Sequence, residues 1–200
     1  MRKAQFWLVT LLAPLCGAPA WAQDTAGAGT PRWEVAIGYS YIRANLLRAD
    51  GCCFPMNGAS GSLAYNFNDW FGLAADFGIY LRDNVRGTTF DLTIFSYMAG
   101  PRFSYRKDDR YTPFAQLLVG GGHAGGSLYT QPVVSSQPLG AHHAFALALG
   151  GGVDIRVTDR FALRVVQTEY FFTRFRNGRN DRQNNLRVTA GFVFRFGQRD

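Results

Sequence analysis

The chain has 200 residues and a formal net charge of +7, and it contains 17 Phe, 9 Tyr and 23 Gly but only 3 Met. This length suits one domain, and aromatic residues and Gly in excess favour strands with tight turns over helices, which prefer Ala, Leu, Glu and Lys. The arginines are scattered and form no basic helix, so we expect no nucleic acid as a partner and acidic lipid or sugar phosphates instead.

The N-terminus carries a pattern typical of an export signal. Arg2 and Lys3 precede a short apolar run, Phe6 to Leu15, and "AWA" at 20–22 has the small-x-small form of a cleavage site. The run is shorter than the about 20 residues that a membrane-spanning helix needs. We therefore expect a cleaved signal peptide over residues 1–22, followed by a flexible segment over 23–31.

From Arg32 onward, large apolar and small or charged residues alternate with period two, which is typical of strands with two different faces. In the first segment Trp33, Val35 and Ile37 share one face, and Glu34 lies on the other. The eight predicted strands are Arg32–Ile42, Gly61–Phe67, Phe71–Leu81, Thr89–Tyr105, Thr112–Gly122, Ala144–Val157, Phe161–Phe175 and Arg187–Asp200. The last strand places phenylalanines on one parity and Arg187 and Arg195 on the other.

The seventh strand breaks its own alternation. It begins with Phe161, Leu163 and Val165 on the apolar parity, but Gln167 and Glu169 then appear on that same parity. Either a β-bulge resets the register or the strand leaves the apolar zone at this point. We favour the bulge.

The connections between the predicted strands alternate in length. Those after strands two, four and six are short, and the others are long: Arg43–Asn57, Arg82–Thr88, His123–His143 and Arg176–Asn184. Short turns at one end, long loops at the other and an even strand number are typical of an antiparallel barrel in a bacterial outer membrane. We predict an all-β, eight-stranded, antiparallel up-and-down transmembrane β-barrel over residues 32–197, with a tail over 198–200.

A soluble sandwich is the alternative, and the composition of the second face argues against it. Such a protein would expose Lys, Glu and Thr, whereas this face holds Gly, Ala and Ser with isolated charges, as the narrow lumen of an eight-stranded barrel requires. Aromatic residues also gather near the short turns, which fits the girdle of a membrane barrel. They are Trp33, Phe67, Trp70, Phe71, Tyr105, Tyr111, Phe161 and Phe196.

The last strand ends with the pattern polar-x-Gly-x-x-apolar-x-apolar, formed by Thr189, Gly191, Phe194 and Phe196. This pattern looks like the C-terminal signal that the outer-membrane assembly machinery reads, although four residues follow Phe196. An ordinary last strand would produce a similar alternation by itself.

Together with "GPRFSY" at 100–105 and "GGGVDIRV" at 150–157, this architecture resembles the small outer-membrane β-barrel family that includes the OmpA-type transmembrane domain. The resemblance covers about Arg32 to Gly197. It implies a location in the outer membrane of a Gram-negative-type bacterium and contact with lipids, lipopolysaccharide and the assembly machinery. We expect a monomer without the peptidoglycan-binding domain of OmpA.

Six charged residues fall on the inward parity, all of them nearer the short-turn end, and unpaired charges inside a sheet are costly. We therefore predict a lumen network in which aspartates pair with several arginines, with Glu34 as a further member. The residues are Asp76, Arg102, Asp154, Arg156, Arg164 and Arg195. Such a network would close the lumen, although a small-solute channel stays an open alternative.

An enzyme is the rival class, because some eight-stranded barrels that resemble this chain modify lipid A. The candidate bases His123, His142 and His143 lie at the rim of the third long loop with Ser127, Ser135 and Ser136, but no acid beside them would orient a base. We expect no catalytic residues, no cofactor and no metal.

The loops offer two further sets of residues. Arg174, Arg176, Arg179 and Arg182 lie in or beside the fourth long loop, where guanidinium groups would meet lipopolysaccharide phosphates or remain solvated without a ligand. Cys52 and Cys53 lie in the first loop, and an oxidising compartment favours a disulfide there, although adjacent cysteines rarely pair with each other. We thus predict a non-enzymatic barrel with a structural or surface-interaction role.

Overall fold

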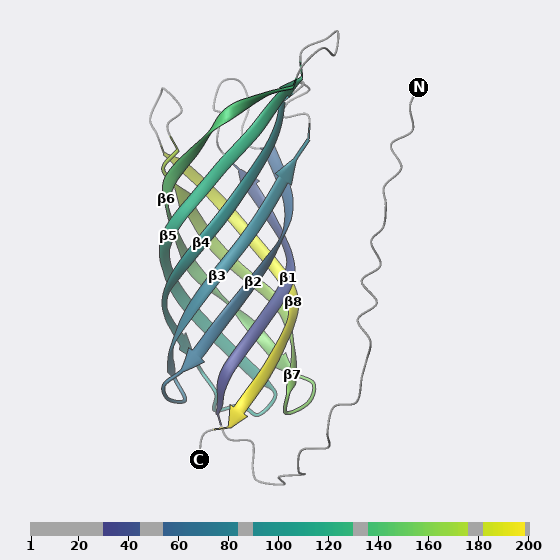
Figure 1. Cartoon of the computed structure of the whole chain (residues 1–200). Helices are drawn as coiled ribbons and strands as arrows, with labels where there is room; N and C mark the ends of the chain where they lie inside the picture. The colour runs from purple at the N-terminus through teal and green to yellow at the C-terminus, as the bar shows by residue number, and fades with distance from the viewer. Residues whose placement is uncertain (1–29, 45–53, 84–89, 130–135, 176–181, 199–200) are drawn as a thin grey trace, which may run out of the picture.

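The computed structural model describes residues 30–44, 54–83, 90–129, 136–175 and 182–198, which form a closed antiparallel barrel of eight strands (Figure 1). Each strand pairs with the next, and β1 pairs with β8. The strands are β1 Pro31–Ala44, β2 Phe54–Asn66, β3 Phe71–Arg82, β4 Phe90–Ser104, β5 Tyr111–Tyr129, β6 Ser136–Arg156, β7 Phe161–Thr173 and β8 Gln183–Gln198. The predicted fold class is confirmed.

Some predictions fall on residues outside the described ranges. These are the signal peptide over 1–22, most of the segment over 23–31, both cysteines Cys52 and Cys53, the loop residues Arg176 and Arg179, and residues 199–200 of the tail. Within the described ranges, no helix has the length and apolar character needed to cross a bilayer.

The two faces of the sheet have opposite character, as the alternation predicts. Outward side chains are large and apolar, and Ile37 and Phe192 expose 59% and 50% of their surfaces. Inward side chains are buried, polar ones included: Ser40 and Arg187 both have 0% exposure. Closure of the sheet pairs every strand edge, which a lipid environment requires of the backbone.

Two of the predicted long loops are shorter than expected. β2 begins at Phe54, and the predicted connection from His123 to His143 is largely a hairpin, because β5 runs to Tyr129 and β6 starts at Ser136. A register shift between Ala124 and Gly126 marks the irregularity in this hairpin. Its glycines hide the alternation of side chains, but ladder hydrogen bonds between strands need only backbone groups.

The predicted bulge in β7 is present. The register between β7 and β8 shifts between Arg164 and Gln167, and Val165 and Val166 are both exposed on the outer surface. The extra residue turns Gln167 and Glu169 inward, where both are buried.

The short turns lie at the bottom of Figure 1, and the predicted aromatic residues belong to these turns or to the strand ends beside them. Trp33 contacts Tyr65 with ring centroids 4.7 Å apart, and Trp70 stacks on Phe103 at 6.1 Å. The turns themselves are ordered by carboxyl and amide side chains. Asn68 Oδ1, for example, accepts hydrogen bonds from the backbone N–H groups of Trp70 and Phe71.

The long-loop half of the lumen is filled by bulky apolar side chains rather than by small residues alone. Ile42, Met56, Ile94, Phe171 and Phe175 belong to one buried cluster there. Tyr80 also belongs to it and lies across Gly78, where a Cβ atom would collide with the phenol ring. The absent side chain at Gly78 therefore gives Tyr80 its place.

Candidate functional site

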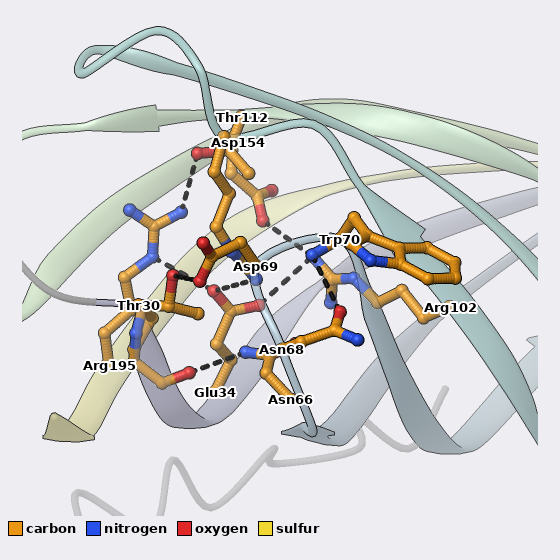
Figure 2. A network of polar contacts seen from close by, with 12 residues as sticks. Thr30, Glu34, Asn66, Asn68, Asp69, Trp70, Arg102, Thr112, Asp154 and Arg195 are labelled. Carbon is orange, nitrogen blue, oxygen red and sulfur yellow. Dashed lines mark hydrogen bonds and ion pairs between the residues drawn. The ribbon is translucent and has the colours of Figure 1, made fainter. Parts of the chain in front are cut away.

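The buried charges of the lumen form two clusters at different heights. The short-turn cluster consists of Glu34, Arg102, Arg106, Asp154, Arg164 and Arg195. The mid-barrel cluster consists of Asp76, Tyr80, Gln116, Glu169 and Arg187. Figure 2 shows part of the short-turn cluster, with Glu34, Arg102, Asp154 and Arg195 converging from separate strands.

Asp154 on β6 is the first carboxylate of the short-turn cluster. Its Oδ1 accepts from Arg164 Nε at 2.8 Å, and its Oδ2 accepts from Arg164 Nη2 at 3.0 Å and Arg102 Nη2 at 3.2 Å. Both guanidinium groups also lie over the ring of Phe114, at 4.0 Å for Arg102 and 4.5 Å for Arg164. The carboxylate and the ring together hold two like charges close to each other.

Glu34 on β1 is the second carboxylate of this cluster. Its Oε2 lies 3.2 Å from Arg102 Nη2, and its Oε1 lies 3.2 Å from Arg106 Nη2 and 3.3 Å from Arg195 Nε. Arg195 also donates to Thr112 Oγ1 at 3.3 Å. Four arginines thus share two carboxylates.

Arg187 on β8 is the centre of the mid-barrel cluster. Its Nη1 donates to Asp76 Oδ1 at 2.7 Å and to the Tyr80 hydroxyl at 2.9 Å, and its Nε donates to Glu169 Oε2 at 2.7 Å. Gln116 Nε2 donates to the other oxygen of Glu169 at 2.8 Å. This cluster reaches across the lumen from β3 to β5, β7 and β8.

Gln167 joins the two clusters, because it accepts from Arg164 Nη1 at 2.9 Å and also hydrogen bonds with Glu169. A cavity of about 10 Å³ lies beside this link, lined in part by Asp76, Arg164 and Gln167. Such a volume is close to the minimum that holds one water molecule.

The predicted lumen residues are only partly brought together. Arg102, Asp154, Arg164 and Arg195 meet in the short-turn cluster with Glu34. Asp76 is also buried and paired with an arginine, but its partner is Arg187 in the mid-barrel cluster, which the prediction did not include. The prediction is wrong for Arg156, whose nearest ion pair is with the exposed Asp109 at 3.9 Å, because it is the last residue of β6 and lies at the rim.

Three charged members of the clusters were missed by the sequence prediction. Glu169 was missed because the bulge changes which parity of β7 faces inward. Its position two residues after Gln167 would have placed both side chains inward. Arg187 carries the same parity as Arg195 and could have been found by that signal alone. Arg106 follows the end of β4 and had no strand parity to indicate that it turns back into the lumen.

The residues of the predicted assembly signal lie on both faces of β8. Phe194 and Phe196 are exposed outside, and Phe194 contacts Phe161 with ring centroids 5.3 Å apart. Thr189 is buried inside and shares a hydrogen bond of 2.6 Å with Ser40, while Gly191 is paired with Gly38 across the β1–β8 seam. Recognition by the assembly machinery stays a prediction.

The remaining predicted residues lie towards the long loops. Arg174 and Arg182 are exposed, whereas Arg176 and Arg179 lie outside the described residues. The histidines His123 and His143 face each other across β5 and β6 with ring centroids 4.5 Å apart. His123 Nδ1 is buried and has no hydrogen-bond partner among the described residues, so no carboxylate in these ranges orients that nitrogen.

The fold agrees with a comparison against family models. The model of the outer membrane protein beta-barrel domain matches residues 8–194. The chain belongs to this family. It is therefore an outer-membrane β-barrel of a Gram-negative bacterium.

Two solved structures show the same fold at low sequence identity. Ail, the attachment invasion locus protein of Yersinia pestis, is 20% identical with a TM-score of 0.54, and the match covers 82% of this chain and 99% of Ail. Neisserial surface protein A is 16% identical with a TM-score of 0.57 and coverages of 82% and 97%. A search of curated proteins finds no match.

Proposed function

We propose that this outer-membrane barrel is non-enzymatic, that its lumen is closed by the two charged clusters, and that its long loops carry a structural or surface-interaction role. The observation that supports closure is the reach of the buried guanidinium groups. The short-turn cluster links β1, β4, β6, β7 and β8, and the mid-barrel cluster links β3, β5, β7 and β8.

Passage of a hydrated ion would require these contacts to open. The side chains of Glu34, Asp154, Glu169 and Arg187 are at most 1% exposed, and breaking a buried ion pair by removing one partner costs about 3–5 kcal/mol. An eight-stranded interior is also only wide enough for side chains to fill it. Closure at two heights therefore makes continuous conduction costly.

The non-enzymatic part rests on the surroundings of the candidate bases. His123 and His143 pack against each other, and His123 also faces Phe95, with ring centroids 6.5 Å apart. A nucleophile activated by histidine needs a third group that orients the ring, and within the described part of the chain Nδ1 of His123 has no such partner. These histidines suit a packing role at the outer surface of the barrel.

The surface role is proposed for the fourth long loop and its flanks. Arg174 is exposed beside it, and Arg176, Arg179 and the exposed Arg182 lie within it. We propose that they contact lipopolysaccharide phosphates, since guanidinium groups bind phosphate bidentately. Ail has been solved with the heparin analogue sucrose octasulfate, a polyanion of comparable chemistry. We also propose a monomer that the outer-membrane assembly machinery inserts.

Gel mobility and conductance test the proposal. Refolded mature protein is run heated and unheated in detergent gels and is then added to a planar bilayer. We expect heat-modifiable mobility and no steady conductance, and no conductance in Arg102→Ser or Arg187→Ser, because each leaves one cluster intact. The double variant is expected to conduct, whereas Arg174→Ser at the exposed rim should behave as the unmodified protein. Steady conductance of the unmodified protein would overturn closure and favour a small-solute channel.

A further inference from the structure

The short-turn cluster holds more positive charge than its carboxylates can balance. Four guanidinium groups share Glu34 and Asp154. Three of them, from Arg102, Arg164 and Arg195, lie inside the lumen, and these residues are at most 7% exposed. Asp69 also acts on Arg106, but it lies on the exposed β2–β3 turn, where its carboxylate accepts from Thr30 Oγ1 at 2.5 Å. The cluster therefore carries a net positive charge.

The same cluster contains hydrogen-bond donors that have no acceptor among the described residues. Arg102 Nε, Arg106 Nε and Arg106 Nη1 are buried, and none of them has a partner among the described residues. A buried donor that lacks a partner costs about 1–3 kcal/mol, and more when the group is charged. Burial also lowers the pKa of Arg106 from its ordinary value, as expected for a cation that its neighbours do not fully compensate.

Two of these unpaired donors belong to Arg106, which lies at the mouth of the barrel. It follows the end of β4, its side chain is 10% exposed, and its Nη2 is held by Glu34 while Nε and Nη1 stay available. Arg106 lies at the short-turn end, the same end at which the network of Figure 2 lies, and because its two free donors are buried, the side chain has to turn outward to meet an anion. In a guanidinium group the N–H of Nε lies on the same side as Nη2, as the two bonds of Arg164 to Asp154 show, so Nε and Nη1 of Arg106 point in different directions and each can donate to one phosphate oxygen.

We propose that Arg106, with Arg102 behind it, binds a phosphate oxyanion at the short-turn mouth of the barrel. The phosphate belongs either to free inorganic phosphate or to the headgroup of a membrane lipid beside the mouth. The site is separate from the long loops and does not depend on whether the lumen conducts.

Thermal unfolding in a phosphate-free maltoside detergent tests the site. Inorganic phosphate is titrated at constant ionic strength against sodium chloride, and the midpoint is followed by gel mobility. A ligand that binds only the folded barrel raises the midpoint with concentration. We expect this rise with phosphate and not with chloride, and isothermal titration should give the same affinity. A second arm, with short-chain phosphatidic acid in place of inorganic phosphate, separates a headgroup from a free anion, and binding of either supports the site.

Variants of the same turn make the test specific. Arg106→Gln should weaken phosphate binding by about tenfold or more, the loss expected for hydrogen bonds to a charged group. Lys107→Gln is the matched control, because Lys107 is exposed on the same turn and lies over the Tyr105 ring at 5.9 Å. Glu34→Gln removes a competing carboxylate and should tighten binding. The proposal is overturned if neither probe exceeds chloride, or if Arg106→Gln binds as well as Lys107→Gln.

Discussion

The two charged clusters of the lumen differ in the sign of their excess charge. The short-turn cluster has four arginines for two carboxylates, whereas the mid-barrel cluster has the carboxylates Asp76 and Glu169 for one arginine, Arg187. At mid-barrel the extra carboxylate is satisfied by amides, because Gln116 and Gln167 hydrogen bond with Glu169. At the mouth, arginine donors remain without an acceptor in the described part of the chain.

The difference follows from the distance of each cluster from solvent. A charge in the middle of the barrel can be compensated only by side chains from the surrounding strands, so every oxygen there needs a protein partner. A charge at the rim can also use solvent or an anion from outside. Excess charge is therefore tolerated near the short turns but has to be balanced within the sheet at mid-barrel.

The largest expected effect comes from Arg187→Met. This change leaves Asp76 and Glu169 buried without their guanidinium partner, and we expect the free energy of unfolding to fall by about 3–5 kcal/mol. Urea unfolding in lipid vesicles, followed by tryptophan fluorescence, measures it. The triple variant Asp76→Asn, Glu169→Gln, Arg187→Met should recover much of the loss, because it removes the orphaned charges as well.

A much smaller effect is expected for Arg106→Gln in the other cluster. Glu34 keeps Arg102 and Arg195 as partners, so the free energy of unfolding should change by less than about 1 kcal/mol. The same urea experiment in phosphate-free buffer measures it. If Arg106→Gln destabilised the barrel as strongly as Arg187→Met, the two clusters would not differ in how fully their charges are satisfied.

The smallest effect is expected at the β4–β5 turn and depends on pH. The backbone N–H groups of Tyr111 and Arg110 donate to Asp108 Oδ1 and lower the pKa of this exposed carboxyl. Because the folded pKa lies below the unfolded value of about 3.9, the stabilisation is fully present above the unfolded pKa and is lost as pH falls through the folded pKa.

Asp108→Asn keeps the acceptor oxygen and removes this titration. The unmodified protein should therefore be slightly more stable than the variant near neutral pH, and the two urea midpoints should converge as pH falls below about 4. Midpoints measured near pH 6 and pH 3 test this. A difference that persisted at the lower pH would show that the charge of Asp108 is not its source.

The local features of the barrel could be read from particular residues. Trp33, Val35 and Ile37 indicate an outward apolar face. Gln167 and Glu169, which continue the parity of Val165, indicate the bulge that the structure contains. The His123–His143 region was misread as a loop, because its glycines carry no side chains to show alternation. Backbone pairing, which no side-chain pattern reports, extends both strands there.

The sequence predicted which charged residues lie in the lumen, but it did not predict which of them pair with each other. Parity placed Asp76, Asp154, Arg102, Arg164 and Arg195 inside, but it did not say which of them meet. Asp76 and Arg187 are 111 residues apart in sequence, and their contact depends on the stagger of the strands between them. Arg106 reaches Glu34 from a turn, a position that has no parity at all.

The sequence by itself determined that the chain forms strands with one apolar face, and therefore an outer-membrane barrel, because alternation is a local property set by the side-chain period of two. Only the tertiary structure decided which charges pair and where positive charge is left over. Those choices depend on closure of the sheet, which brings β1 against β8 and places side chains from distant strands at the same height in a narrow lumen.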